Sequence, residues 1–231
     1  MNRRVTHAVV LSRVNYGEAD RIVTLLTETN GVVTVMAKGA RRLKSKLAGG
    51  VEPFSQSEIT YIPGKNGLST LVSAKMISHY SNVSGDFERV SQGYDYLKWI
   101  KKYVEEESGD QGYYAVLVAA LELLNDSSKD SGLAYCYFYL NTLRLEGLAP
   151  DPYRDSSGQK LAAATAYTFD HESSTFVPAD NGPFRQAEVK FIRVLLGDRG
   201  EVAKRISTKN VDLPGIQQLV RQHLTVVEQG L

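Results

Sequence analysis

The sequence of 231 residues has a single cysteine, Cys136. One cysteine excludes a disulfide within the chain and leaves too few thiolates for a cysteine-ligated metal centre. Its neighbours Tyr135, Tyr137 and Phe138 are aromatic, which indicates a buried, inert thiol and not a nucleophile. The chain therefore has to be held together by an ordinary hydrophobic core.

Long hydrophobic runs are also missing. No window approaches the roughly 18 apolar residues that a membrane span requires. The first residues, Met1-Asn2-Arg3-Arg4, are not followed by an uninterrupted apolar segment, so the sequence does not predict a signal peptide. We expect a cytoplasmic protein without a membrane partner.

The reactive groups of common enzymes are not grouped in this sequence. There is no Walker-type phosphate loop and no Gly-x-Ser-x-Gly elbow, and the four histidines (His7, His79, His171 and His223) are scattered. Asp170-His171-Glu172 is the one triplet that resembles a ligand cluster, but adjacent residues in a turn point in different directions. We predict no catalytic residue, no metal site, no cofactor and no small-molecule substrate.

Charge is distributed unevenly along a chain whose formal net charge is only +1. Residues 1–80 hold 11 Lys and Arg against 5 Asp and Glu, a balance of +6, whereas residues 81–231 hold 16 against 21, a balance of −5. At 42% hydrophobic and 23% charged residues, the whole is an ordinary globular protein. We predict a basic domain over 1–80 and an acidic domain over 81–231.

Residues 5–80 show the alternation of β-strands. The expected strands cover residues 5–11, 21–27, 32–37, 54–62 and 68–80, with turns at Asn15 to Glu18, at Asn30-Gly31 and at residues 63–67. About five strands with short hairpins predict a small antiparallel barrel of the OB-fold type, with an SH3-like barrel as the alternative.

The period changes to that of helices after residue 80. Apolar residues at helical spacing predict helices over residues 87–104, 113–124 and 132–147, a hairpin over 166–177 within an irregular insertion at about 150–182, and further helices over 184–195 and 216–227. The helix at 132–147 is apolar nearly all round, so it should lie at the centre of the helical domain. The predicted fold class is α+β.

The strongest candidate for a binding site is the basic stretch 38–50, which the pattern places as a connection between two strands. Five cations and several small residues alternate there, and no acid occurs between Glu28 and Glu52. We predict that this loop binds the phosphates of nucleic acid, with further cations near strand ends and at a hairpin tip. The candidate DNA-binding residues are Lys38, Arg41, Arg42, Lys44, Lys46, Arg13, Arg21 and Lys65.

Two aromatic features of the sequence also bear on binding. Phe54 and Tyr61 are available in the barrel to stack on bases, although a core position suits Phe54 better. The stretch from Lys98 to Tyr103 places aromatics on one helix face and lysines on another. We interpret that helix as core plus a solvated edge; the alternative is a groove for an acidic peptide with an apolar tip.

The N-terminal motifs resemble the RecO family of bacterial recombination mediators. The resemblance rests on Tyr16 to Thr27, Gly31, Ala37 to Arg42, Lys44 to Leu47 and Pro53-Phe54, and it covers residues 5–80 well. It implies an OB-fold followed by a mostly helical domain. It further implies binding to single- and double-stranded DNA in the nucleoid and annealing of complementary strands. With RecR as partner, such proteins help to load RecA onto DNA coated by single-strand-binding protein, which has an acidic tail.

The resemblance implies no catalytic residue, and it does not carry over a metal site. Many relatives have a four-cysteine zinc module after the position that matches Gly147 to Pro150, whereas the stretch from Tyr153 to Gly158 lacks cysteine here. The hairpin is therefore expected to be metal-free. Two other functions stay open at this point: an adaptor whose basic barrel docks an acidic partner without binding DNA, and a nuclease, for which no carboxylate cluster can be assembled.

Overall fold

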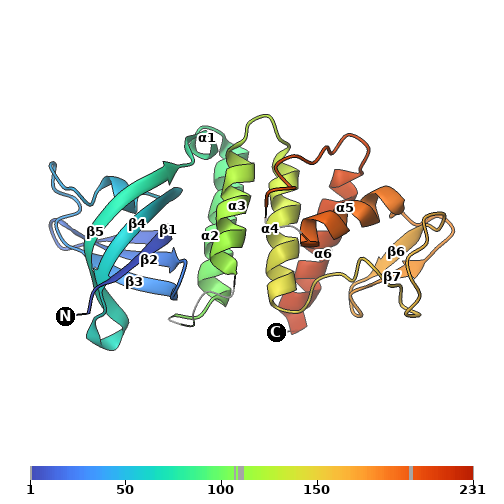
Figure 1. The fold of residues 1–231 in the computed structure, drawn as a ribbon, viewed down its shortest axis with the longest axis horizontal. Coiled ribbons are helices and arrows are strands. Elements are labelled where there is room, and N and C mark those ends of the chain that lie inside the picture. Colours follow the sequence, from blue (N-terminus) through green and yellow to red (C-terminus); the bar gives the residue numbers. More distant parts are fainter. Residues whose placement is uncertain (1, 107, 109–111, 198–199, 231) are drawn as a thin grey trace. The chain divides into compact units, whose positions relative to one another are not determined.

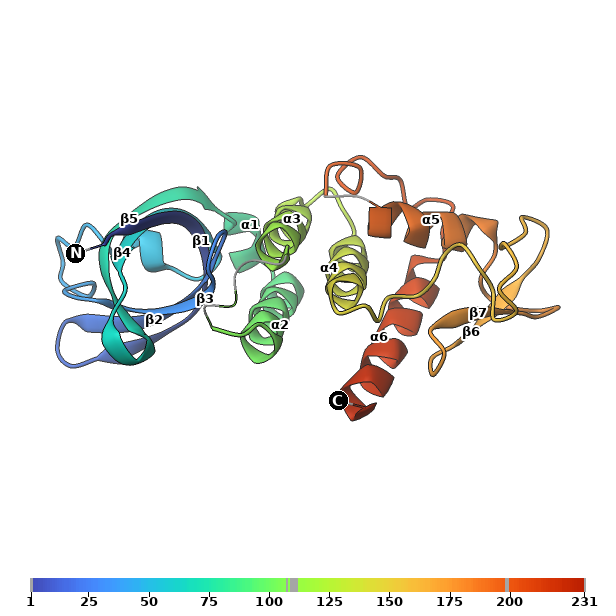
Figure 2. The same cartoon turned by 60° about the horizontal axis from the view of Figure 1, so that its bottom comes forward.

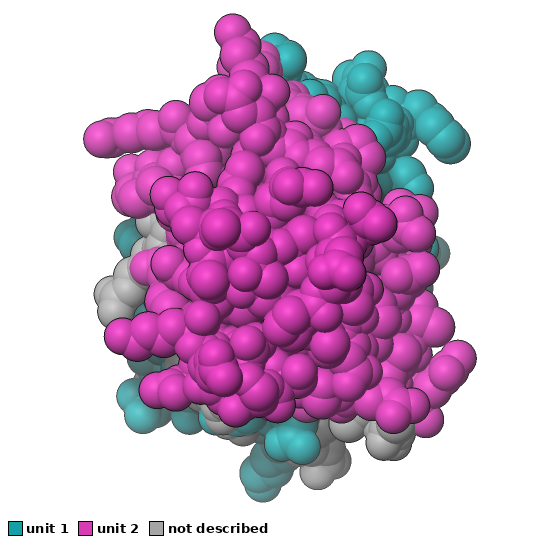
Figure 3. All heavy atoms as spheres, turned by 90° about the vertical axis from the view of Figure 1, so that its right-hand side faces the viewer, with its two compact units in different colours: residues 1–127 teal, residues 128–231 magenta. Residues whose placement is uncertain are grey.

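The chain folds into two compact units, Met1–Ser127 and Ser128–Leu231, which are coloured separately in Figure 3. This computed structural model describes residues 2–106, 108, 112–197 and 200–230. Within those residues, none of the helices has both the length and the hydropathy that crossing a bilayer would take. Each unit is described separately below.

The first unit begins with a closed five-stranded barrel (Figure 1). Its strands are β1 (Arg4–Tyr16), β2 (Asp20–Thr27), β3 (Gly31–Ala37), β4 (Ser55–Ile62) and β5 (Leu68–His79). The order around the barrel is β1-β2-β3-β5-β4, and β4 closes it by pairing with β1. All pairs are antiparallel except β3 with β5, which is parallel. The predicted OB-like barrel is confirmed.

The interior of the barrel is filled by alternate residues of each strand. Because side chains alternate between the two faces of a strand, partners in register deliver their apolar groups to the same side. Val10 pairs with Leu25, which pairs with Val33, and all three are buried. Tyr61 is completely buried in the same core. The turn after β1 falls at residues 17–19, slightly later than predicted, because β1 extends to Tyr16.

Three helices complete the first unit. α1 (Ser81–Ser84) is a single turn that was not predicted, while α2 (Phe87–Tyr103) and α3 (Tyr113–Asn125) lie side by side along the barrel (Figures 1 and 2). The Asp86 side chain caps α2 by accepting a hydrogen bond from the Arg89 amide at 3.0 Å. Gln56 of β4 donates to the Tyr114 hydroxyl of α3 at 2.8 Å. The barrel ends near residue 80, but the compact unit continues through α3.

The second unit is built around α4 (Ser131–Leu145), which is buried on nearly every face, as predicted. It packs against α5 (Gln186–Gly197) and α6 (Leu213–Gly230), and the hairpin of β6 (Tyr167–Asp170) and β7 (Thr175–Pro178) precedes α5. Asn141 of α4 donates to the Leu195 carbonyl of α5 at 3.0 Å. Phe184, predicted to start a helix, precedes α5 and instead bridges to Tyr167 of the hairpin.

Candidate nucleic-acid interface

The basic stretch forms the long connection from β3 to β4, at one end of the barrel. The β1–β2 turn, residues 17–19, lies at the same end, because β1 and β2 pair from Tyr16 and Asp20 onward while Arg21 pairs with Ala37. We call this the loop end. The opposite end, formed by the β2–β3 turn (28–30) and the β4–β5 turn (63–67), we call the turn end.

Hydrogen bonds fasten the basic loop to the β1–β2 turn. Asp20 Oδ1 accepts the Gly39 amide at 2.7 Å, and the Ala19 carbonyl accepts the Arg41 amide at 2.9 Å. Arg41 Nη1 also donates to the Gly17 carbonyl at 3.1 Å. Gly39 has φ +68°, a left-handed conformation that glycine adopts at little cost. The loop therefore holds a defined shape as it leaves the sheet.

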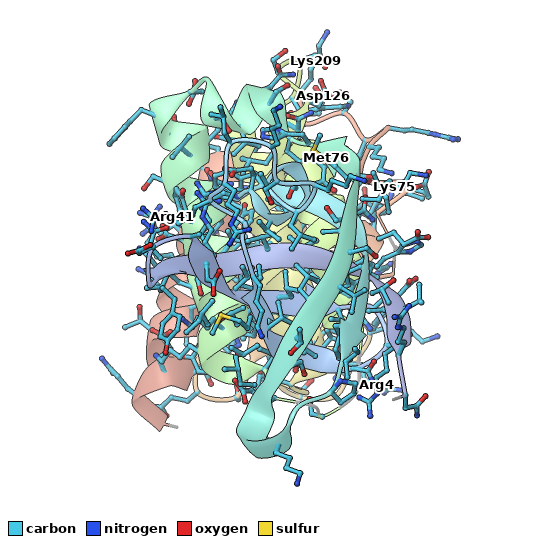
Figure 4. The ribbon with its side chains drawn as sticks, turned by 90° about the vertical axis from the view of Figure 1, so that its left-hand side faces the viewer. Arg4, Arg41, Lys75, Met76, Asp126 and Lys209 are labelled. Atoms are coloured by element: carbon cyan, nitrogen blue, oxygen red, sulfur yellow. The ribbon has the colours of Figure 1, made fainter. Side chains whose placement is uncertain are left out.

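Small and apolar residues of the loop pack inward, and its cations face solvent. Ala40 is 2% exposed in the barrel core, and Leu47 packs against the same core. The five predicted loop cations are all exposed: Lys38, Arg41, Arg42, Lys44 and Lys46. Among them stands Leu43, whose side chain is fully exposed. The arrangement presents five exposed cations on an anchored loop, and Figure 4 labels one of them, Arg41.

Arg13 and Arg21 lie next to this loop but are not independent cations. Both guanidinium groups donate to Glu52 Oε1, which follows the loop, and the Arg21 contact measures 3.1 Å. Partial burial alone would raise the pKa of Glu52, but the hydrogen bonds and charges of the two arginines hold that pKa below its ordinary value. The group formed by Arg13, Arg21 and Glu52 has a net charge of only +1. It therefore stabilises the loop end more than it adds to the cationic surface.

Lys65 does not extend this surface. It lies in the β4–β5 turn, where β4 has just run antiparallel to β1 from Val9 to Arg4, so it sits at the turn end. The basic loop follows β3 and lies at the loop end, one strand reversal away. Figure 1 shows the β4–β5 turn and the loop after β3 at opposite ends of the barrel. Of the eight predicted residues, the structure brings seven together.

Phe54 and Tyr61, the two possible stacking partners in the barrel, are buried and cannot stack on bases. Phe54 is 3% exposed and packs edge-on against Tyr94, with ring centroids 4.8 Å apart, and Tyr61 has no exposed surface. Two exposed residues on β1 were missed: Val14 and Tyr16, which are 64% and 54% exposed. The signal was present, since alternation puts residues 12, 14 and 16 on one face of a strand.

The helix face around Trp99 agrees with the interpretation as core plus solvated edge. Trp99 is half-buried and packs on Tyr103 and Tyr113, at ring-centroid distances of 4.7 and 6.4 Å. Lys98 and Lys101 are exposed, and Lys101 Nζ donates to Ser12 Oγ of β1 at 3.2 Å. That contact places one lysine of α2 beside the exposed stretch of β1.

Comparison with known proteins matches both parts of the chain. The family model described as "Recombination protein O N terminal" matches residues 1–80, and "Recombination protein O C terminal" matches residues 86–227. The chain belongs to the RecO family of DNA repair proteins. The resemblance drawn from the N-terminal motifs is confirmed, and it extends over the helical part.

Individual RecO proteins show how far the similarity reaches. DNA repair protein RecO of Desulfatibacillum aliphaticivorans is 32% identical over 63% of this chain and 57% of its own length. The RecO protein of an Exiguobacterium strain is 32% identical over 65% of this chain and 59% of its own length. That of Dehalococcoides mccartyi strain 195 is 30% identical over 76% of this chain and 68% of its own length. The chain thus matches less than two thirds of the length of the first two relatives.

The segment where many RecO proteins are expected to carry zinc is organised here by other means. Asp155 Oδ1 accepts the Ser157 hydroxyl at 2.7 Å and the amides of Ser157 and Gln159 at 2.9 and 3.0 Å, and these bonds lower the pKa of Asp155. Among the residues that the structure describes, no group of three or more His, Cys, Asp or Glu could hold a metal ion. The residues present do not fit a zinc module.

Aromatic packing supplies the rest of the order in this segment. Phe176 is completely buried, with ring centroids 5.2 Å from Phe169 and 5.8 Å from Phe184. Arg193 of α5 stacks over Tyr153 at 4.7 Å and donates to the Pro152 carbonyl at 2.8 Å. A small apolar cluster and hydrogen-bonded turns therefore order this segment, which was expected to be metal-free.

The structure also places Cys136 and the triplet Asp170 to Glu172, the other residues considered for chemistry. Cys136 is buried in α4, and desolvation raises the pKa of its thiol far above the range where it would form a thiolate. Asp170 accepts hydrogen bonds from the Ser173 hydroxyl and the Glu172 amide, while the His171 ring stacks on His223 with centroids 5.8 Å apart. Asp170 is thus hydrogen-bonded within its own turn, and His171 packs on His223 of α6.

Proposed function

We propose that this RecO-family chain is a DNA-binding recombination mediator without catalytic activity, and that the loop end of its barrel grips DNA. The observation that carries the proposal is the basic loop: five exposed cations on a connection that is fastened by hydrogen bonds and anchored in the core. Phosphate contacts of this kind give affinity for single- and double-stranded DNA without sequence preference.

The size of the electrostatic contribution follows from the number of cations. Each phosphate neutralised on a single strand contributes about −0.7 to the slope of log K against log salt concentration, and each on a duplex about −0.9. Five loop cations correspond to slopes of about −3.5 and about −4.5. Arg13 and Arg21 add little to these values, because they share the charge of Glu52.

The wider role follows the family resemblance. In our proposal the bound strands are annealed, and together with RecR the chain helps to load RecA onto DNA covered by single-strand-binding protein. The acidic tail of single-strand-binding protein would be a further ligand for the exposed cations of this chain. None of these steps needs a covalent reaction by the chain, so we expect no cleavage of labelled DNA in the presence of a divalent metal ion.

The test removes the loop cations. A variant with Arg41, Arg42, Lys44 and Lys46 all replaced by Ala should have a single-strand salt slope shallower by about 2.8 than that of the unaltered protein, with affinity reduced for every sequence alike. A matched control replaces four exposed cations of the second unit (Lys160, Lys190, Arg205 and Lys209) and loses the same net charge. Equal losses in both variants would contradict the proposal, and the absence of salt-dependent DNA binding by the unaltered protein would favour the adaptor.

A further inference from the structure

The outer face of the β1–β2 hairpin carries apolar side chains that the barrel does not cover. Beyond the bulge between Val10 and Ser12, β1 pairs with β2 without interruption as far as Tyr16. Arg13 pairs with the core residue Val23, so residues 12, 14 and 16 point to the outside of the barrel. Val14 and Tyr16, at 64% and 54% exposed, therefore form an exposed strip.

A second strand widens this strip. Ile22 of β2 pairs with Val14, and Met36 of β3 pairs with Ile22, so the apolar row crosses three strands. Ile22 and Met36 are both half-buried. Isolated exposed apolar residues are common on protein surfaces, but a contiguous row is a feature of binding surfaces.

Cations stand at both ends of the strip. At one end Lys101 Nζ of α2 contacts Ser12 Oγ at 3.2 Å, and at the other Arg41 Nη1 contacts the Gly17 carbonyl at 3.1 Å, next to Tyr16. Each contact uses one donor and leaves the remaining N–H groups of the ammonium and the guanidinium for a ligand. From Ser12 to Tyr16 the strand advances about 13 Å, at about 3.3 Å per residue.

We propose that this hairpin strip, made of Ser12, Val14, Tyr16, Ile22, Lys101 and Arg41, holds unstacked bases of single-stranded DNA. Tyr16 stacks on a base, Val14 and Ile22 contact its neighbours, and Lys101 and Arg41 bind the phosphates on either side. The inference rests on the proposed function and deepens it. A duplex hides the faces of its bases, so the strip contributes to single-strand binding alone.

Charge complementarity selects this ligand over an apolar protein surface. A nucleic-acid strand combines flat apolar bases with an anion at each step, which matches an apolar row between two cations and beside the basic loop. Asp20, which pairs with Tyr16, accepts a hydrogen bond from the Gly39 amide. Glu18 is exposed in the turn and reduces the local positive charge without covering the strip.

The test separates base contacts from phosphate contacts. Binding of the full chain is measured to a thymidine oligomer and to an abasic oligomer of equal length, which has the same phosphates and no bases. We expect the unaltered protein to prefer the thymidine oligomer by about 5-fold or more, the range of one base stacked on an aromatic side chain. Tyr16→Ala should lose this preference and bind the abasic oligomer as before, whereas Tyr16→Phe should keep it.

Two control variants are matched by exposure and charge. Tyr153 of the second unit is also 54% exposed, and Tyr153→Ala should leave the preference unchanged. Lys101→Ala should weaken binding to both oligomers, while Lys98→Ala on the same helix, where Lys98 is paired with Asp95 at 3.6 Å, should have a smaller effect.

The outcomes keep the two proposals apart. Equal binding of both oligomers by the unaltered protein, or a Tyr16→Ala variant that retains the base preference, would overturn the role of the hairpin strip and leave the basic loop as the DNA site. Failure to bind either oligomer in a salt-dependent manner would instead overturn the proposed function itself.

Discussion

The loop end and the turn end of the barrel both carry cations, but they arrange them differently. At the loop end, five exposed cations share one anchored connection. At the turn end, Lys65 lies in a short turn, and acids lie close by: Glu28 contacts His7 at 2.9 Å, and Glu106 accepts a hydrogen bond from Thr34 at 3.2 Å. Arg4 begins β1 at the turn end, where it pairs with Tyr61 of β4. Figure 4 shows it far from Arg41 of the loop end in the view onto the barrel.

The two ends differ in the neighbours of their charges, and in our proposal these neighbours decide which cations bind DNA. Cations crowded on a short loop repel one another, and a polyanion that neutralises them relieves this repulsion and releases its own counterions. A lysine in a turn beside acids gains little from such a ligand. In our proposal, counting cations in residues 1–80 therefore overstates the surface that binds phosphate, because Arg13 and Arg21 share the charge of Glu52 and Lys65 lies at the turn end.

Charge reversal at each end gives the largest expected contrast. Arg42→Glu at the loop end should weaken DNA binding about 10-fold, since it removes one phosphate contact and places an anion among the remaining cations. Lys65→Glu changes the net charge by the same amount at the turn end and should weaken binding less than about 2-fold. Filter binding at constant salt concentration measures both. Similar losses would mean that overall charge, and not its arrangement, attracts DNA.

The placement of Lys65 could have been worked out from the sequence. The basic loop follows the third strand and the Lys65 turn follows the fourth, so successive reversals of an antiparallel barrel put them at opposite ends. Alternation and turn residues gave the barrel, because they are local signals. The same alternation, followed to the end of β1, would have predicted that the Tyr16 side chain is exposed, as it is in the structure.

The pairing of Arg13 and Arg21 with Glu52 could not be predicted in the same way. Glu52 is 39 residues from Arg13 and 31 from Arg21, and its contact with both depends on how the long loop returns to the barrel. Phe54, with φ at +54°, takes a backbone conformation that is uncommon outside glycine, and it turns its ring toward Tyr94. Such tertiary contacts lie beyond periodicity and spacing.

Removing Glu52 should separate stability from affinity at the loop end. Glu52→Gln leaves two partly buried arginines facing each other, and we expect the free energy of unfolding to fall by about 1 kcal/mol, a small value because solvent screens the cluster. Affinity for DNA should rise about 3-fold, since the loop end gains one positive charge. Denaturation and DNA titration of the same preparation measure the two effects. A variant that weakens DNA binding would contradict the supporting role of this cluster.

The pH dependence of the unaltered protein provides a second measure of Glu52. Its pKa is below the ordinary 4.5 when folded, so its contribution to stability is fully present above pH 4.5 and is lost as the pH falls through the lower folded value. Glu52→Gln lacks this titration. As the pH falls below 4.5, the variant should therefore lose less stability than the unaltered protein. Parallel losses would show that other carboxyl groups account for the acid sensitivity.

Two leucines within the basic loop give the smallest contrast. Leu47 packs against the barrel core, and Leu47→Ala should lower the free energy of unfolding by about 0.5–1 kcal/mol, the cost of a partly buried side chain. Leu43 is fully exposed, so Leu43→Ala should change stability by less than about 0.5 kcal/mol. Hydrogen exchange of the barrel amides reports this difference without contributions from the second unit. Equal effects would mean that the loop is not anchored, and a mobile loop would present its cations to DNA without the defined shape on which the contrast between the two ends depends.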